Sequence, residues 1–185
     1  MDQCDAELRG HAKKLILSRF HPTADFTLAS AAADNTVRVW DVAAQKCSVI
    51  YEDIKSASTG MEWSYDGSLI GAVSKDKQAN IFDPRKEGSA MVCQTHEGAR
   101  PQKLCWLGNN THFLTTGFSK ISERQYAVFD TRDLSQPLIM KRLDDYNGIP
   151  YPFFDEDTQL LFIAGRGEAA ITYYQYSTTS PNYID

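Results

Sequence analysis

The sequence predicts an all-β protein built from four copies of one structural repeat. Three observations lead to this fold class. A short motif of alternating apolar residues with an aromatic residue near its end recurs at a nearly constant spacing, short β-rich runs precede each copy, and turn-forming residues separate the runs. We find no amphipathic helical pattern of useful length.

The recurring motif identifies the repeat and its length. The chain reads TVRVWD at 36–41, QANIFD at 78–83, QYAVFD at 125–130 and, more weakly, AITYYQ at 170–175. The aromatic residues Trp40, Phe82, Phe129 and Tyr174 follow one another at spacings of 42, 47 and 45 residues. A repeat of about 40–45 residues that ends in Trp-Asp is typical of the WD40 β-propeller, with one blade per repeat. We therefore expect an open arc of about four blades, approximately 8–52, 53–94, 95–142 and 143–185.

Within each repeat, β-rich runs alternate with Gly, Asn, Asp and Pro turns. The first repeat predicts strands at 15–20, 27–31, 37–41 and 48–51, and the second at 60–63, 69–73, 79–83 and 90–94. The third predicts strands at 103–106, 113–116 and 125–130, with an enlarged turn at 119–124. The fourth predicts strands at 151–154, 160–164 and 171–176.

Composition excludes several function classes. Nineteen Lys and Arg against 24 Asp and Glu give the 185-residue chain a net charge of −5, which argues against nucleic acid as a partner. No apolar run approaches the roughly 20 residues that cross a bilayer, so we expect no membrane insertion. The polar, acidic first residues do not resemble an export signal. We expect Cys4, Cys47, Cys93 and Cys105 to be reduced thiols and predict no metal and no cofactor.

Four polar residues of the first repeat fall at the positions of the structural tetrad of WD40 blades. His11 precedes the first strand, Ser30 lies in the second, Asp34 lies in the tight turn and Trp40 lies in the third. A buried network of this kind is stable when every donor and acceptor is satisfied. A catalytic Ser–His–Asp arrangement would need an exposed nucleophile, so we predict a structural role and no enzyme activity.

The other repeats retain only parts of this set. The second has Asp76 but carries Ala72 and Phe82 in place of Ser30 and Trp40. The third has His96 and Thr116 but Phe129 in place of the tryptophan, and the fourth offers Glu168 and Tyr174. We expect these blades to depend more on sheet packing than on the network.

A second prediction concerns one face of the propeller. The loops that enter each first strand and the turns between second and third strands share this face, whereas the acidic turns at 25, 66 and 155–157 lie on the opposite one. The predicted partner contacts on the first face are Lys75, Lys77, Arg100, Lys120 and Arg124. An ordinary mixed surface is the alternative, because Glu97, Glu123 and Glu168 lie near these cations.

Several stretches resemble the coronin family of actin-associated propeller proteins, over about residues 8–183. The most specific are HEGARP at 96–101 and TTGFSK at 115–120 followed by SERQ at 122–125; others are SKDK at 74–77, FDPR at 82–85 and FDEDT at 154–158. Some details resemble the long coronins with two propellers. The resemblance implies a seven-bladed propeller, of which the remaining blades are missing from this chain. The family's basic N-terminal segment and its C-terminal extension have no counterpart here.

The coronin resemblance implies a function as an actin-filament-binding module in cytoskeleton organisation, located in the cytoplasm. It also implies an influence on the actin-branching complex. The alternative is a scaffold or adaptor for protein–protein interaction in vesicle trafficking, which the resemblance to long coronins permits.

Overall fold

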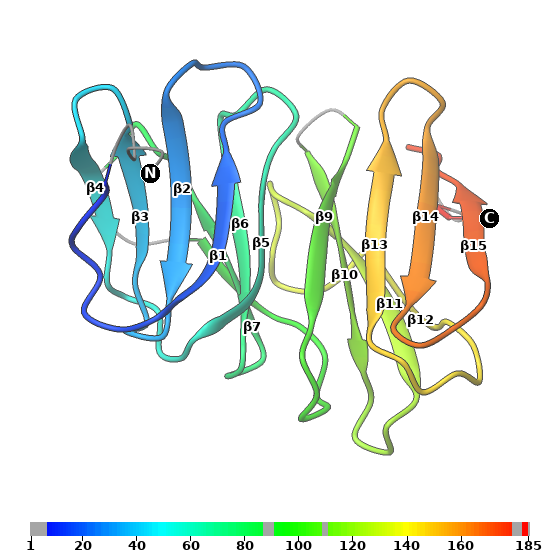
Figure 1. The fold of residues 1–185 in the computed structure, drawn as a ribbon. Helices are drawn as coiled ribbons and strands as arrows, with labels where there is room; N and C mark the ends of the chain where they lie inside the picture. Colours follow the sequence, from blue (N-terminus) through cyan, green and yellow to red (C-terminus); the bar gives the residue numbers. More distant parts are fainter. Residues whose placement is uncertain (1–6, 87–90, 109–110, 179–182, 185) are drawn as a thin grey trace.

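The computed structural model describes residues 7–86, 91–108, 111–178 and 183–184. In these residues the chain forms four antiparallel sheets that follow one another around an arc, as Figure 1 shows from blue to red. Fifteen strands are found in the described residues and no helix, which confirms the all-β prediction. Nor does any helix long and apolar enough for a membrane span occur in this part of the chain.

The first two sheets each contain four strands in sequence order. The first consists of β1 (Leu15–Phe20), β2 (Thr27–Ala32), β3 (Val37–Asp41) and β4 (Lys46–Tyr51). The second consists of β5 (Ser58–Trp63), β6 (Ile70–Ser74), β7 (Gln78–Phe82) and β8 (Met91–Gln94). The predicted start of β8 at Ala90 lies outside the described residues, as does Cys4.

The third and fourth sheets continue the pattern. The third consists of β9 (Lys103–Leu107), β10 (His112–Phe118), β11 (Arg124–Asp130) and β12 (Ile139–Arg142), and the sequence did not predict β12. The fourth consists of β13 (Pro150–Asp155), β14 (Leu160–Gly165) and β15 (Ile171–Gln175). An isolated bridge between Tyr176 and Ile184 follows β15.

The inner strands β1, β5, β9 and β13 lie beside one another in that order, so the sheets stack face to face. Because side chains alternate along a strand, the second and third sheets each present one apolar face to the sheet before and the other apolar face to the sheet after. Three buried clusters fill the spaces between successive sheets. Indole groups add a repeated link, since Trp63 donates to the Arg19 carbonyl at 3.0 Å and Trp106 donates to the Glu62 carbonyl at 3.1 Å.

The turns between second and third strands have a common geometry. Each contains one residue with positive φ, namely Asn35 (64°), Lys77 (70°), Ser122 (66°) and Gly167 (85°). Figure 1 shows the turns after β2, β10 and β14 at its lower end. The arc therefore presents one set of similar tight turns on a single face.

Candidate partner-binding face and the polar network beneath it

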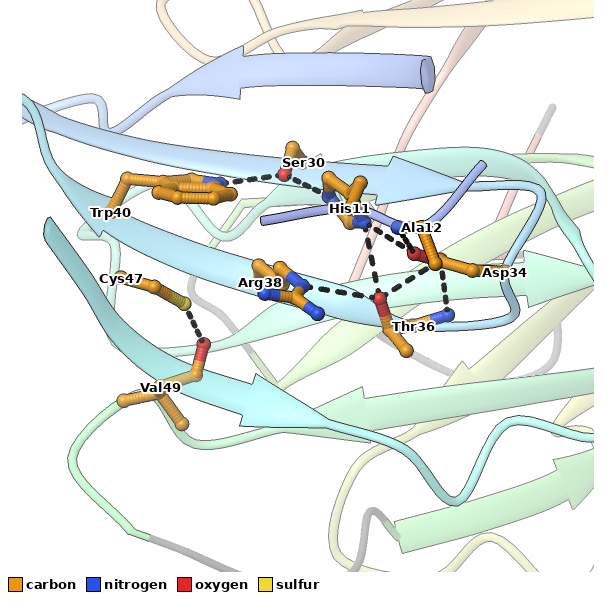
Figure 2. A network of polar contacts seen from close by, with 9 residues as sticks. All are labelled: His11, Ala12, Ser30, Asp34, Thr36, Arg38, Trp40, Cys47 and Val49. Carbon is orange, nitrogen blue, oxygen red and sulfur yellow. Dashed lines mark hydrogen bonds and ion pairs between the residues drawn. The ribbon is translucent and has the colours of Figure 1, made fainter. Parts of the chain in front are cut away.

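The structure brings the four predicted tetrad residues together in one chain of hydrogen bonds (Figure 2). The Trp40 indole N–H donates to Ser30 Oγ at 2.7 Å, and Ser30 Oγ lies 2.7 Å from His11 Nε2. His11 Nδ1 lies 3.0 Å from Asp34 Oδ2. Because a carboxylate only accepts, His11 Nδ1 carries a proton, and in the neutral imidazole Nε2 then accepts the Ser30 hydroxyl.

Asp34 is the acceptor at the end of this chain. It receives the Ala12 N–H at 2.9 Å and both the N–H and the hydroxyl of Thr36, at 3.1 and 2.9 Å. Burial by itself raises the pKa of Asp34, but these bonds and the one from His11 outweigh it and hold the pKa well below its usual 3.8. Sequence reasoning missed Thr36, although an Asp followed two residues later by Thr is a recognisable turn motif.

The network does not expose a nucleophile. Ser30 is buried, and its hydroxyl bonds to an indole on one side and an imidazole on the other. A hydroxyl committed in this way cannot attack a substrate, because attack needs access as well as a base. The geometry is that of a structural network that fastens the loop before β1 to the first sheet.

The third sheet contains a partial copy of the network, and the predicted partner of its histidine is wrong by one residue. His96 Nε2 lies 3.0 Å from the hydroxyl and 3.2 Å from the carbonyl of Thr115, not Thr116. The Thr116 hydroxyl instead donates to the Pro150 carbonyl at 2.8 Å. Successive residues of a strand point to opposite faces, so this slip of one position moves the side chain to the other side of the sheet.

Four of the five predicted partner contacts lie on the face of the tight turns. Lys75 and Lys120 are exposed, whereas Lys77 and Arg100 are half-buried. Lys120 Nζ pairs with Glu97 at 3.1 Å. In the described part of the chain, no carboxylate lies within ion-pair distance of Lys75, Lys77 or Arg100. These three cations are therefore available to an external anionic group.

Arg124 is the exception, and its prediction as a surface contact is wrong. Its side chain is only 1% exposed and lies between the third and fourth sheets. Nη1 lies 2.5 Å from Glu168 Oε1, Nε lies 3.3 Å from Asp144 Oδ1, and the Tyr146 ring lies 5.9 Å away. Glu168 takes the space where a side chain on Gly165 would lie. Arg124 thus joins two sheets and cannot reach a partner.

The opposite face carries acidic turns, and its main cations are already paired. Arg85 and Lys86 pair with Asp83, and Arg132 pairs with Asp130. Asp25 and Asp66 are exposed in the turns after β1 and β5. Lys75, Lys77 and Arg100, which have no ion pair in the described residues, lie on the other face.

Comparisons with known proteins identify the relatives of this chain. Residues 2–41 match the WD domain, G-beta repeat family model. The chain is 39% identical to "Coronin-like protein crn1" of Schizosaccharomyces pombe over 97% of its own length and 30% of the relative, and 39% identical to human "Coronin-7" over 88% and 18%. The crystal structure of the WD40 domain from Toxoplasma gondii coronin superposes with a TM-score of 0.91 at 32% identity, covering 98% of this chain and 47% of that one. The chain thus spans about a third or less of the curated relatives it matches.

Proposed function

Because this chain is a homologue of the coronin WD40 propellers along nearly its whole length, we propose that it serves as part of an actin-filament-binding propeller. Within that role, the face of the tight turns contacts the filament. The filament surface is acidic, and the partner must complement the cations of this face. The chain acts as a non-enzymatic binding module of the cytoskeleton in the cytoplasm, and the actin-branching complex is a second partner of the same protein.

The observation that carries this proposal is the set of cations without ion pairs on one face. Lys75 and Lys77 flank the tight turn after β6, and Arg100 lies in the loop that enters β9. A lysine already paired with a protein carboxylate must give up that contact before it can bind a partner. Lys75, Lys77 and Arg100 have no such cost in the described structure, and complementary charge raises both the association rate and the specificity of a complex.

Cosedimentation with actin filaments at increasing salt concentration tests the proposal. When the complete propeller is supplied, we expect weak binding that decreases as salt is added, because exposed charges are screened. The variant Lys75→Glu/Lys77→Glu should pellet less with filaments, whereas Lys46→Glu, an exposed lysine at the start of β4, should behave like the wild type.

Salt-insensitive pelleting, or an equal effect of both variants, would show that this face is not the filament site. Failure of the wild type to pellet would instead favour the scaffold or adaptor role. Charge reversal of Arg124 is unsuitable for this test, because it would place a carboxylate beside Glu168 and Asp144 and disturb folding.

A further inference from the structure

A hollow of about 330 Å³ opens on the face of the tight turns, between the second and third sheets. The residues that line it are Thr59 at the start of β5, Ser74 at the end of β6, Lys75 in the turn that follows, and the loop from Gly98 to Gln102. Its volume is at the lower end of the range for small-molecule sites, which suits one side chain better than an extended ligand.

Two cations stand at this hollow. Lys75 is exposed and Arg100 is half-buried, and neither has a carboxylate within ion-pair distance in the described residues. The Arg100 guanidinium lies 4.1 Å from the centre of the Phe118 ring. Contact with an aromatic ring orients a guanidinium while leaving its N–H donors free for a planar, two-oxygen group.

The polar groups around the cations are occupied by the protein itself. The Thr59 hydroxyl donates to the Gln102 carbonyl at 2.9 Å, and the Ser74 hydroxyl donates to Asp76 Oδ1 at 2.5 Å. The Gln102 side-chain amide donates to the His96 carbonyl at 2.9 Å. The hollow therefore presents the positive charges of Lys75 and Arg100, and the Asp76 carboxylate, which the Ser74 hydroxyl contacts, is not among the groups that line it.

The loop that carries Arg100 is held in place before any ligand binds. The Gly98 N–H donates to the Phe118 carbonyl at 2.7 Å, and a side-chain carbon on Gly98 would come within 2.5 Å of that oxygen. Gln102 is buried and accepts the Thr95 hydroxyl at 2.5 Å. Because the loop is already ordered, binding there costs little conformational entropy.

We propose that this hollow is a carboxylate subsite, in which an Asp or Glu side chain of an acidic protein segment lies between Lys75 and Arg100. The inference rests on the proposed function only for the identity of the partner, an actin filament. A carboxylate fits this combination because the guanidinium offers a fork to its two oxygens, while the lysine adds a mobile second charge.

The test measures, by fluorescence anisotropy at low salt, the binding of a labelled hexaglutamate peptide whose two ends are blocked and uncharged. We expect Lys75→Gln and Arg100→Gln each to weaken binding by about two- to fivefold, as exposed ion pairs do, and the double variant to weaken it more. Lys46→Gln is the matched control and should not change binding. Circular dichroism of the double variant checks that the loop substitution leaves the fold intact.

Three outcomes would overturn the subsite. They are equal binding by the double variant and the wild type, an equal loss in the Lys46→Gln control, and displacement of the peptide by inorganic phosphate at matched ionic strength as effectively as by free hexaglutamate. The last result would indicate a general anion site.

If binding of the peptide depends on Lys75 and Arg100 but filaments do not pellet, the subsite stands and the actin proposal fails. If filaments pellet with the double variant as with the wild type and the peptide shows no dependence, the subsite and the filament contact through this face both fail, while filament binding itself stands.

Discussion

The first and third sheets protect equivalent aromatic residues by different chemistry. Trp40 in β3 and Phe129 in β11 occupy matching positions, opposite Leu28 and Phe113 in the neighbouring strands. Both are buried, at 3% and 0% exposure. Trp40 lies under the loop that carries His11 and is hydrogen-bonded to Ser30, whereas Phe129 stacks on Phe113 at 5.2 Å with ring planes 11° apart.

The difference follows from what covers each sheet. The third sheet lies between the second and the fourth, and apolar clusters fill both spaces. The first sheet shares a cluster with the second on one face only, and the polar loop before β1 covers Trp40 on the other. A hydrogen-bonded loop can thus replace a neighbouring sheet locally. Where no such loop lies in the described residues, as over Tyr173 of the fourth sheet, aromatic side chains remain exposed.

The largest effect should come from these uncovered aromatics. Phe153, Phe162 and Tyr173 form a row across β13, β14 and β15, with ring centres 6.4 and 6.3 Å apart. Contiguous apolar surface of several hundred Å² promotes association, so we expect this chain to self-associate in light-scattering measurements. Phe153→Ser/Tyr173→Ser should lower the scattering mass, and Tyr65→Ser, at an exposed turn, should not. A monodisperse wild-type monomer would show that the uncovered face is tolerated.

Next in size is the loss of stacking in the third sheet. Phe129→Ala should reduce the free energy of unfolding by about 3–5 kcal/mol, since it leaves a cavity among rigid neighbours. Denaturant unfolding at low protein concentration measures it. A cost under about 1 kcal/mol would mean that the neighbouring sheets collapse onto the cavity.

Arg124→Ala should cost a similar amount. Removal of one partner from a buried ion pair typically costs about 3–5 kcal/mol, because the remaining charges stay buried without compensation. Here those charges are Glu168 and Asp144. The matched control is Arg142→Ala, since Arg142 is half-exposed and its ion pairs are on the surface. Equal unfolding midpoints for the two variants would contradict a role for Arg124 in joining the sheets.

The sequence predicted the features that depend on residues close together in the chain, and it missed contacts that form only when two sheets pack against each other. Strands and tight turns could be found because alternation and turn chemistry are local. The β12 strand was missed because its four residues are largely exposed and carry little apolar pattern. Arg124 looks like a surface cation in sequence, since its partners Asp144 and Glu168 are 20 and 44 residues away and meet it only when two sheets pack together.

The third sheet should also be the more acid-sensitive at mild pH. Burial lowers the pKa of His96 to about 4, whereas the unfolded chain binds a proton near 6.5. Stability from neutral His96 is therefore complete above pH 6.5 and declines as the pH falls toward 4, by about 3 kcal/mol. His96→Gln should flatten the pH dependence of unfolding between these values. An unchanged slope in the variant would assign the acid sensitivity to other groups.

The smallest effect separates the network of the first sheet from an ordinary turn. Asp34→Ala should reduce the free energy of unfolding by about 1–3 kcal/mol, because it leaves the donors of His11 and Thr36 without their acceptor. Asp66→Ala should cost less, since Asp66 is exposed although it accepts bonds from Ser64 and Ser68. Asp25→Ala, at an exposed turn with no side-chain hydrogen bond in the described structure, should stay within about 0.5 kcal/mol.

The pH dependence gives the same comparison a second readout. Because the folded-state pKa of Asp34 is depressed, the stability it contributes is present above its unfolded value of 3.8 and is lost as the pH falls below it. Asp34→Asn should therefore weaken the wild-type decline in stability below pH 4. If the Asp34 and Asp25 variants unfold alike at every pH, the hydrogen-bonded loop does not stabilise the first sheet, and Trp40 is held by packing alone.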